Sequence, residues 1–127
     1  MTDSISILII EGEPNLRREC ASALTEVSFT VADVRDYPEA LLKLNEFKPD
    51  MVIVDESLLG RDGIEVCSQL RSTFGVPVVL LGEDSSDEMW ERVMEAEVDL
   101  YLVKPFSYRE LVARVKAILR RYKMARA

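Results

Sequence analysis

The stretch Met51-Val52-Ile53-Val54-Asp55 decides the fold, because it is an apolar run of strand length that ends on a carboxylate. A second run, Tyr101-Leu102-Val103, is followed by Lys104 and Pro105. Apolar runs without clean alternation are typical of parallel strands that are buried on both faces. Since the carboxyl ends of parallel strands share one edge of a sheet, we predict that Asp55 and Lys104 meet there, a carboxylate beside an ammonium.

Similar runs recur along the chain, and segments with helical spacing separate them. Leu111, Val115 and Ile118, for example, form an i, i+3/i+4 stripe that predicts a helix near the end of the chain. Strand and helix alternate five times, which predicts an α/β doubly wound parallel sheet with helices on both faces. The predicted strands are residues 5–10, 29–34, 51–54, 76–81 and 100–103.

Length and composition favour one compact cytoplasmic domain. The chain has 127 residues, of which 48% are apolar, so it is large enough to bury a core and we predict a single domain.

The formal net charge of −7 argues against nucleic-acid binding by this domain, because such binding needs a basic surface. We expect no membrane partner, because no run of about eighteen apolar residues and no signal-peptide pattern is present. Cys20 and Cys67 lie in predicted helices and are expected to be free thiols.

The residue types present also limit the enzymatic alternatives. The sequence contains no histidine, which excludes Ser-His-Asp hydrolysis, His-ligated zinc sites and an internal phosphohistidine. A small hydrolase on this scaffold would need a general base and a phosphate-cradling glycine-rich loop, and the sequence offers neither. We therefore expect a signalling or binding domain rather than an enzyme.

Three segments carry a resemblance to a known family: residues 52–55, 59–66 and 99–106. In this order they resemble the receiver domain of two-component response regulators, and the similarity covers essentially all 127 residues. The resemblance implies a CheY-like, flavodoxin-like fold with five parallel strands in the order 2-1-3-4-5. Residues 104–115 are most similar to the OmpR/PhoB class, whose receivers usually precede a winged-helix DNA-binding domain. Residues 121–127 are then the start of a linker to such a domain, unless the receiver acts alone.

The resemblance assigns roles to the two residues that are predicted to meet. It implies that Asp55 accepts a phosphoryl group from the phosphohistidine of a sensor histidine kinase, and that Lys104 stabilises the charge that develops during transfer. It also implies a cis peptide bond between Lys104 and Pro105. Without the resemblance, Asp55 would read as a strand-end cap and Lys104 as a solvated surface charge.

The set of metal-binding acids that the family carries after its first strand is incomplete in this chain. Most receivers have two adjacent aspartates after the first strand, whereas this chain has Glu11-Gly12. The resemblance leaves Glu11, Asp55 and the carbonyl of Ser57 as a poor Mg²⁺ site, since Mg²⁺ demands near-octahedral oxygen geometry. Glu13 is expected to cap the first helix rather than to bind metal.

The switch that reads out phosphorylation in the family is also altered. Gly82 stands where receivers usually have Thr or Ser, whose hydroxyl binds the phosphoryl group, and Glu83 replaces a small residue. Tyr101 matches the aromatic switch position but lacks that trigger. The two losses together predict a degenerate receiver with at most residual Mg²⁺-dependent self-phosphorylation. The alternative is a phosphorylation-independent pseudo-receiver that acts as a dimerisation or protein-binding module.

Output is expected through a protein interface. OmpR/PhoB-class receivers dimerise through the fourth helix, fifth strand and fifth helix by cross-subunit ion pairs, so the resemblance implies a homodimer. Glu95 and Lys116 fit one such pair, whereas the usual partners of two others are replaced by apolar residues. An exposed Trp90 would anchor this contact; its plainer interpretation is a core-edge residue. The predicted interface residues are Trp90, Glu95, Leu100, Glu110, Arg114 and Lys116.

Overall fold

The computed structural model describes residues 4–57 and 62–126, so positions 59–61 of the second family-like segment lie outside the described residues. The strands are β1 (Ser6–Ile10), β2 (Thr30–Val34), β3 (Met51–Asp55), β4 (Val78–Gly82) and β5 (Leu100–Val103). The helices are α1 (Pro14–Glu26), α2 (Tyr37–Phe47), α3 (Gly63–Phe74), α4 (Asp87–Glu95) and α5 (Tyr108–Arg126).

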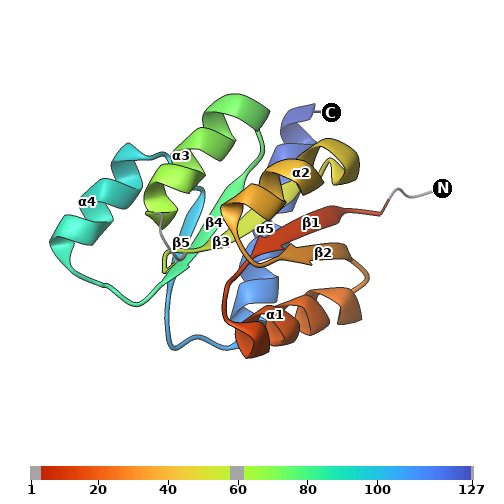
Figure 1. Cartoon of the computed structure of the whole chain (residues 1–127), viewed down its shortest axis with the longest axis horizontal. Coiled ribbons are helices and arrows are strands. Elements are labelled where there is room, and N and C mark those ends of the chain that lie inside the picture. Colours follow the sequence, from red (N-terminus) through yellow and green to blue (C-terminus); the bar gives the residue numbers. More distant parts are fainter. Residues whose placement is uncertain (1–3, 58–61, 127) are drawn as a thin grey trace.

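All strand pairs are parallel, and the sheet order is β2-β1-β3-β4-β5, which confirms the predicted topology (Figure 1). Strand β4 differs most from its prediction. It begins at Val78 because Pro77 has no backbone N–H to donate, and the carboxylate of Asp99 accepts the N–H of Val78 at 2.7 Å. It extends to Gly82, whose carbonyl accepts the N–H of Lys104 at 2.7 Å.

Two apolar layers cover the two faces of the sheet. Buried side chains of α2, α3 and α4 pack with alternate residues of the strands on one face, and those of α1 and α5 pack on the other (Figure 1). Strand β3 shows the consequence: Val52 and Val54 face the first layer, whereas Met51 and Ile53 face the second. Because both faces are covered, the central strands are apolar along their length, which is the pattern that predicted them.

Side chains satisfy the first backbone N–H groups of the helices. Glu13 caps α1 by accepting the N–H groups of Asn15 and Leu16, which confirms its predicted role. Ser86 caps α4, and Ser107 accepts the N–H of Glu110 at the start of α5. These caps fix where the helices begin, directly after the loops at the carboxyl edge of the sheet.

Two expectations about the whole chain can be compared with the structure. Cys20 and Cys67 are free and buried, as predicted. Within the part of the chain that the structure describes, every helix is too short or too polar to span a bilayer.

Candidate functional site

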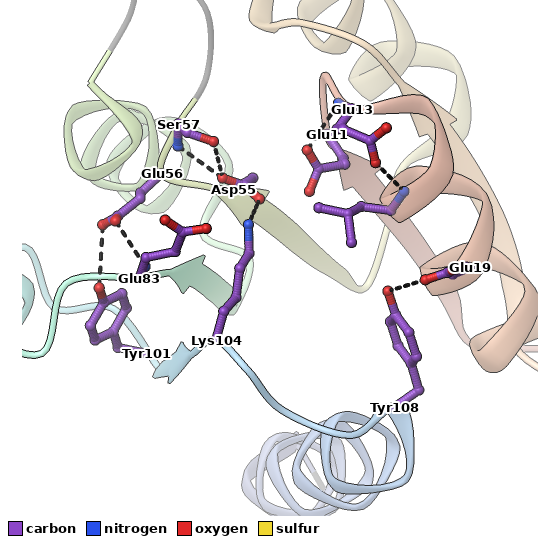
Figure 2. Close-up of polar contacts among 11 residues, drawn as sticks. Glu11, Glu13, Glu19, Asp55, Glu56, Ser57, Glu83, Tyr101, Lys104 and Tyr108 are labelled. Atoms are coloured by element: carbon purple, nitrogen blue, oxygen red, sulfur yellow. Dashed lines mark hydrogen bonds and ion pairs between the residues drawn. The ribbon is translucent and has the colours of Figure 1, made fainter.

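The carboxyl ends of three neighbouring strands converge on one ion pair. Asp55 is the last residue of β3 and Lys104 directly follows β5, while β4 lies between these strands. The Nζ atom of Lys104 donates to Oδ2 of Asp55 at 2.6 Å (Figure 2). The Lys104–Pro105 peptide bond is cis, as the resemblance implied. The predicted proximity is therefore found, and the pair sits where ligands bind in open α/β sheets.

The Asp55 carboxylate is buried and fully engaged. Only 1% of its side chain is exposed, and its Oδ1 atom accepts the backbone N–H of Ser57 at 2.9 Å and the hydroxyl of Ser57 at 2.6 Å. Burial by itself raises the pKa of Asp55, but hydrogen bonds with Glu11, Lys104 and Ser57 outweigh it and lower the pKa to about 2. Asp55 is thus ionised at neutral pH.

Glu11 is the second buried acid at this edge. It follows β1, is 5% exposed, and its Oε2 atom accepts the N–H of Glu13 at 3.1 Å. Burial, followed by the contact with the Asp55 carboxylate, raises the pKa of Glu11 to about 7. The two carboxyl groups therefore differ in protonation: Asp55 is charged, whereas Glu11 holds a proton for much of the time near neutral pH.

The predicted Mg²⁺ ligands Glu11, Asp55 and Ser57 do lie together, but they offer few free oxygens. Residues 4–57 and 62–126 contain no group of three or more Asp, Glu, Cys or His side chains placed to hold a metal ion. Asp55 already accepts hydrogen bonds from Lys104 and Ser57, and Glu11 retains a proton for much of the time near neutral pH. A Cβ atom on Gly12 would meet only the carbonyl oxygen of Arg35, at 3.5 Å, so the space for a further side chain is open.

The loop after β4 contains a contact that sequence reasoning missed. A Cβ atom on Gly82 would lie 2.5 Å from Cδ of Glu56 and 2.6 Å from the hydroxyl of Tyr101, so these two side chains fill the space that a larger residue would take (Figure 2). The Oε1 atom of Glu56 accepts the N–H of Glu83 at 3.0 Å. The only signal in the sequence was an acidic residue directly after Asp55 together with a glycine at position 82.

The predicted output residues all lie on α4, β5 or α5. Trp90 is 39% exposed on α4, and its ring packs edge-on against Tyr101 with centroids 5.0 Å apart. Leu100 is partly buried in β5, and Glu110 and Arg114 form an exposed ion pair of 3.7 Å within α5. Around Trp90, α4 exposes mainly acids, whereas the exposed face of α5 is mainly basic. The acids are Asp87, Glu88, Glu91 and Glu95, and the bases are Arg109, Arg114, Lys116, Arg120 and Arg121.

Known proteins resemble this chain in sequence and in structure. A sequence profile described as the response regulator receiver domain matches residues 7–116. The transcriptional regulatory protein ResD of Bacillus subtilis is 36% identical over 120 residues, which make up 94% of this chain and 50% of ResD. The crystal structure of a two-component response regulator from Clostridium difficile has a TM-score of 0.88 and 28% identity, covering 94% of this chain and 98% of that one.

A further solved structure bears on the class of regulator. DrrB, described as a Thermotoga maritima OmpR/PhoB homolog, has a TM-score of 0.86 and 27% identity, over 94% of this chain and 54% of DrrB. The chain spans about half the length of the curated relatives it matches.

Proposed function

The chain belongs to the response regulator receiver domain family, and from this premise we propose that it is a receiver of OmpR/PhoB type whose phosphoacceptor is Asp55. The observation that carries the proposal is the buried, ionised Asp55 paired with Lys104 at the carboxyl edge of the sheet. Among the described acidic residues, only Asp55 combines the end of a strand with a lysine opposite. Its role is that of a phosphoacceptor in signalling rather than of an enzyme with a small-molecule product.

The proposed reaction is the transfer of a phosphoryl group to the Asp55 carboxylate. An oxygen of Asp55 attacks phosphorus, the new P–O bond forms, and the P–N bond to the histidine of a partner kinase breaks, so that the imidazole leaves. Lys104, which is released from its ion pair by the same event, then faces the phosphoryl oxygens. Mg²⁺, which receiver domains generally bind at this site, supplies further charge neutralisation when it is bound.

We propose that metal binding is weak in this receiver. Mg²⁺ is commonly held by one or two carboxylates together with water molecules, at near-ideal octahedral geometry. Glu11 loses a proton only near neutral pH, and Gly12 provides no carboxylate. The cation therefore has to compete both with the proton on Glu11 and with Lys104 at Asp55.

The wider arrangement of the protein is proposed from its relatives. Residues 1–127 form the receiver, and residues 121–127 begin the linker to an effector domain, because the curated relatives are about twice as long. ResD is named as a transcriptional regulatory protein, and MtrA of Mycolicibacterium smegmatis, which is 38% identical to this chain over 115 residues, is named as a DNA-binding response regulator. By analogy DNA binding would belong to the effector domain, since the receiver carries a net charge of −7.

The proposed partners are a sensor histidine kinase or another signalling protein and a second copy of this chain. The dimer would form through α4, β5 and α5, which carry Trp90 and Leu100 as well as exposed charged side chains. A second candidate function, a pseudo-receiver that dimerises or binds a partner without phosphorylation, is favoured by the contact of Glu56 with Tyr101, which exists without a phosphoryl group.

One experiment separates the two functions. The chain is incubated with acetyl phosphate, or with beryllofluoride, at millimolar Mg²⁺, and the mass shift and amide NMR spectrum are recorded. A receiver gains one phosphoryl group, and Asp55→Asn abolishes the gain. A pseudo-receiver gains none and shows no spectral change. Stoichiometric phosphorylation of another residue would remove the assignment of Asp55.

A further inference from the structure

Glu56 follows the proposed phosphoacceptor, but its side chain points away from Asp55, toward Glu83 and Tyr101 (Figure 2). Its backbone N–H donates to the carbonyl of Leu81 at 2.8 Å, which ties residue 56 to the end of β4. Its carboxylate accepts the N–H of Glu83 at 3.0 Å and contacts the hydroxyl of Tyr101 at 3.3 Å. Glu56 thus joins the ends of three strands, β3, β4 and β5.

The location of this carboxylate depends on the glycine at position 82. The Cδ and Oε2 atoms of Glu56 lie 2.5 Å and 2.6 Å from the place of a Cβ atom on residue 82. Real Cβ atoms essentially never approach other heavy atoms so closely. A serine or threonine at position 82 is therefore incompatible with the present positions of both the Glu56 carboxylate and the Tyr101 hydroxyl.

The Tyr101 ring is held inward by the same group of contacts. It is 6% exposed, and its hydroxyl donates to the carbonyl of Asp84 at 2.7 Å. The Asp84 side chain in turn accepts the N–H of Ser86, the N-cap of α4, at 2.8 Å. Tyr101 thereby links β5 to the loop that begins α4, and Trp90 of α4 packs edge-on against its ring.

We infer that Glu56 is a positioning residue: its carboxylate takes the place of the missing side chain at Gly82 and holds Tyr101 turned inward when Asp55 carries no phosphoryl group. The α4–β5 surface is then preset by a residue of the chain itself rather than by the state of Asp55. That Tyr101 is the read-out residue of a receiver rests on the proposed function. The contact itself is independent of phosphorylation.

The electrostatics of Tyr101 agree with a persistent contact. Burial, followed by the nearby Glu56 charge, raises the pKa of Tyr101 to about 12, while the single hydroxyl hydrogen is donated to the carbonyl of Asp84. The phenol therefore stays protonated and keeps its hydrogen to donate throughout the physiological pH range.

The test uses the full chain without any phosphodonor and compares Glu56→Ala with Glu56→Gln. Trp90 is the single tryptophan, so its fluorescence and its ring-current effect on Tyr101 NMR signals report the contact between the two rings. In Glu56→Ala we expect the Tyr101 signals and the Trp90 emission to shift, and the pKa of Tyr101 to fall from about 12 toward its ordinary value of 10. Glu56→Gln should retain most of the native signals, because its amide oxygen still accepts the N–H of Glu83.

The matched control is Glu83→Ala, which removes an exposed carboxylate from the same loop and keeps the backbone N–H that Glu56 accepts. It should leave Trp90 and Tyr101 unchanged. Glu56→Ser, whose side chain is too short to reach the space at Gly82, is the second variant should Glu56→Ala fail to fold, and it should reproduce the Glu56→Ala shifts. Native signals for Tyr101 in Glu56→Ala or in Glu56→Ser would overturn the inference. Failure of Asp55 to accept phosphate would overturn the proposed function instead and leave the role of Glu56 intact.

Discussion

Lys104 and Asp55 are 49 residues apart in the sequence, yet the lysine ammonium lies 2.6 Å from the aspartate carboxylate. The lysine side chain is 19% exposed and the aspartate side chain 1%, so solvent reaches Lys104 but hardly reaches Asp55. In the proposed reaction, a phosphodonor would approach a carboxylate whose charge is already compensated by Lys104. Hydrogen bonds with Glu11, Lys104 and Ser57 together keep Asp55 ionised despite its burial.

Removal of the lysine alone should destabilise the fold. Lys104→Met leaves the buried Asp55 charge without its partner, and we expect the free energy of unfolding to fall by roughly 2–3 kcal/mol at pH 7, below the usual cost of 3–5 because Lys104 reaches solvent. Urea unfolding measures the change. The control is Asp55→Asn combined with Lys104→Met, which removes both charges and should recover most of the loss. Equal destabilisation by the single and double variants would show that the ion pair is not the cause.

Gly12→Asp should strengthen Mg²⁺ binding by roughly tenfold or more, because it adds a carboxylate at the edge where Glu11 and Asp55 already lie. The backbone accommodates the change, since a Cβ atom at this position meets only the carbonyl of Arg35 at 3.5 Å. Titration of Mg²⁺ followed by amide NMR gives the dissociation constants. Gly12→Asn, of similar size but neutral, is the control and should gain much less. Tight binding by the native chain would contradict the proposed weakness of its site.

The sequence was enough to predict which side chains meet when they directly follow buried strands. It was not enough for side chains whose positions depend on packing between several loops. Asp55 and Lys104 were placed correctly because apolar runs define parallel strands and parallel strands end together. The role of Glu56 was not predictable in this way. Its position depends on the volume left free at Gly82 and on the orientation of Tyr101, so it follows from packing between separate loops rather than from any local pattern.

Stability should fall as pH rises through the range in which Glu11 ionises. Its pKa is raised from 4.5 to about 7 on folding, so between these values the folded state binds the proton more tightly than the unfolded state does. The free energy of unfolding should therefore decrease over this window, by on the order of 3 kcal/mol. Asp55 has the opposite shift, from 3.8 to about 2, so its contribution is lost as pH falls below about 4.

Glu11→Gln tests the assignment of this pH dependence, because it keeps the shape of the side chain and cannot ionise. In metal-free buffer, denaturant unfolding from pH 4.5 to 8 should show a smaller decline for Glu11→Gln than for the native chain. Glu19→Gln on α1 is the control and should keep the native slope. An unchanged decline in Glu11→Gln would assign the pH dependence to another group.

The last prediction concerns association through α4, β5 and α5. Exposed ion pairs contribute roughly 0–1 kcal/mol each and are screened by salt, whereas burial of an apolar side chain contributes about 1.5–3 kcal/mol. With Trp90 and Leu100 at this surface, a dimer should persist or tighten as ionic strength rises, and Trp90→Ala should weaken it by about tenfold or more. Sedimentation across a salt series measures both effects. Leu42→Ala is the control, because Leu42 is 78% exposed on α2 at a different part of the surface. A dimer that dissociates in salt, or one that Trp90→Ala leaves intact, would show that Trp90 is a core-edge residue and not an anchor.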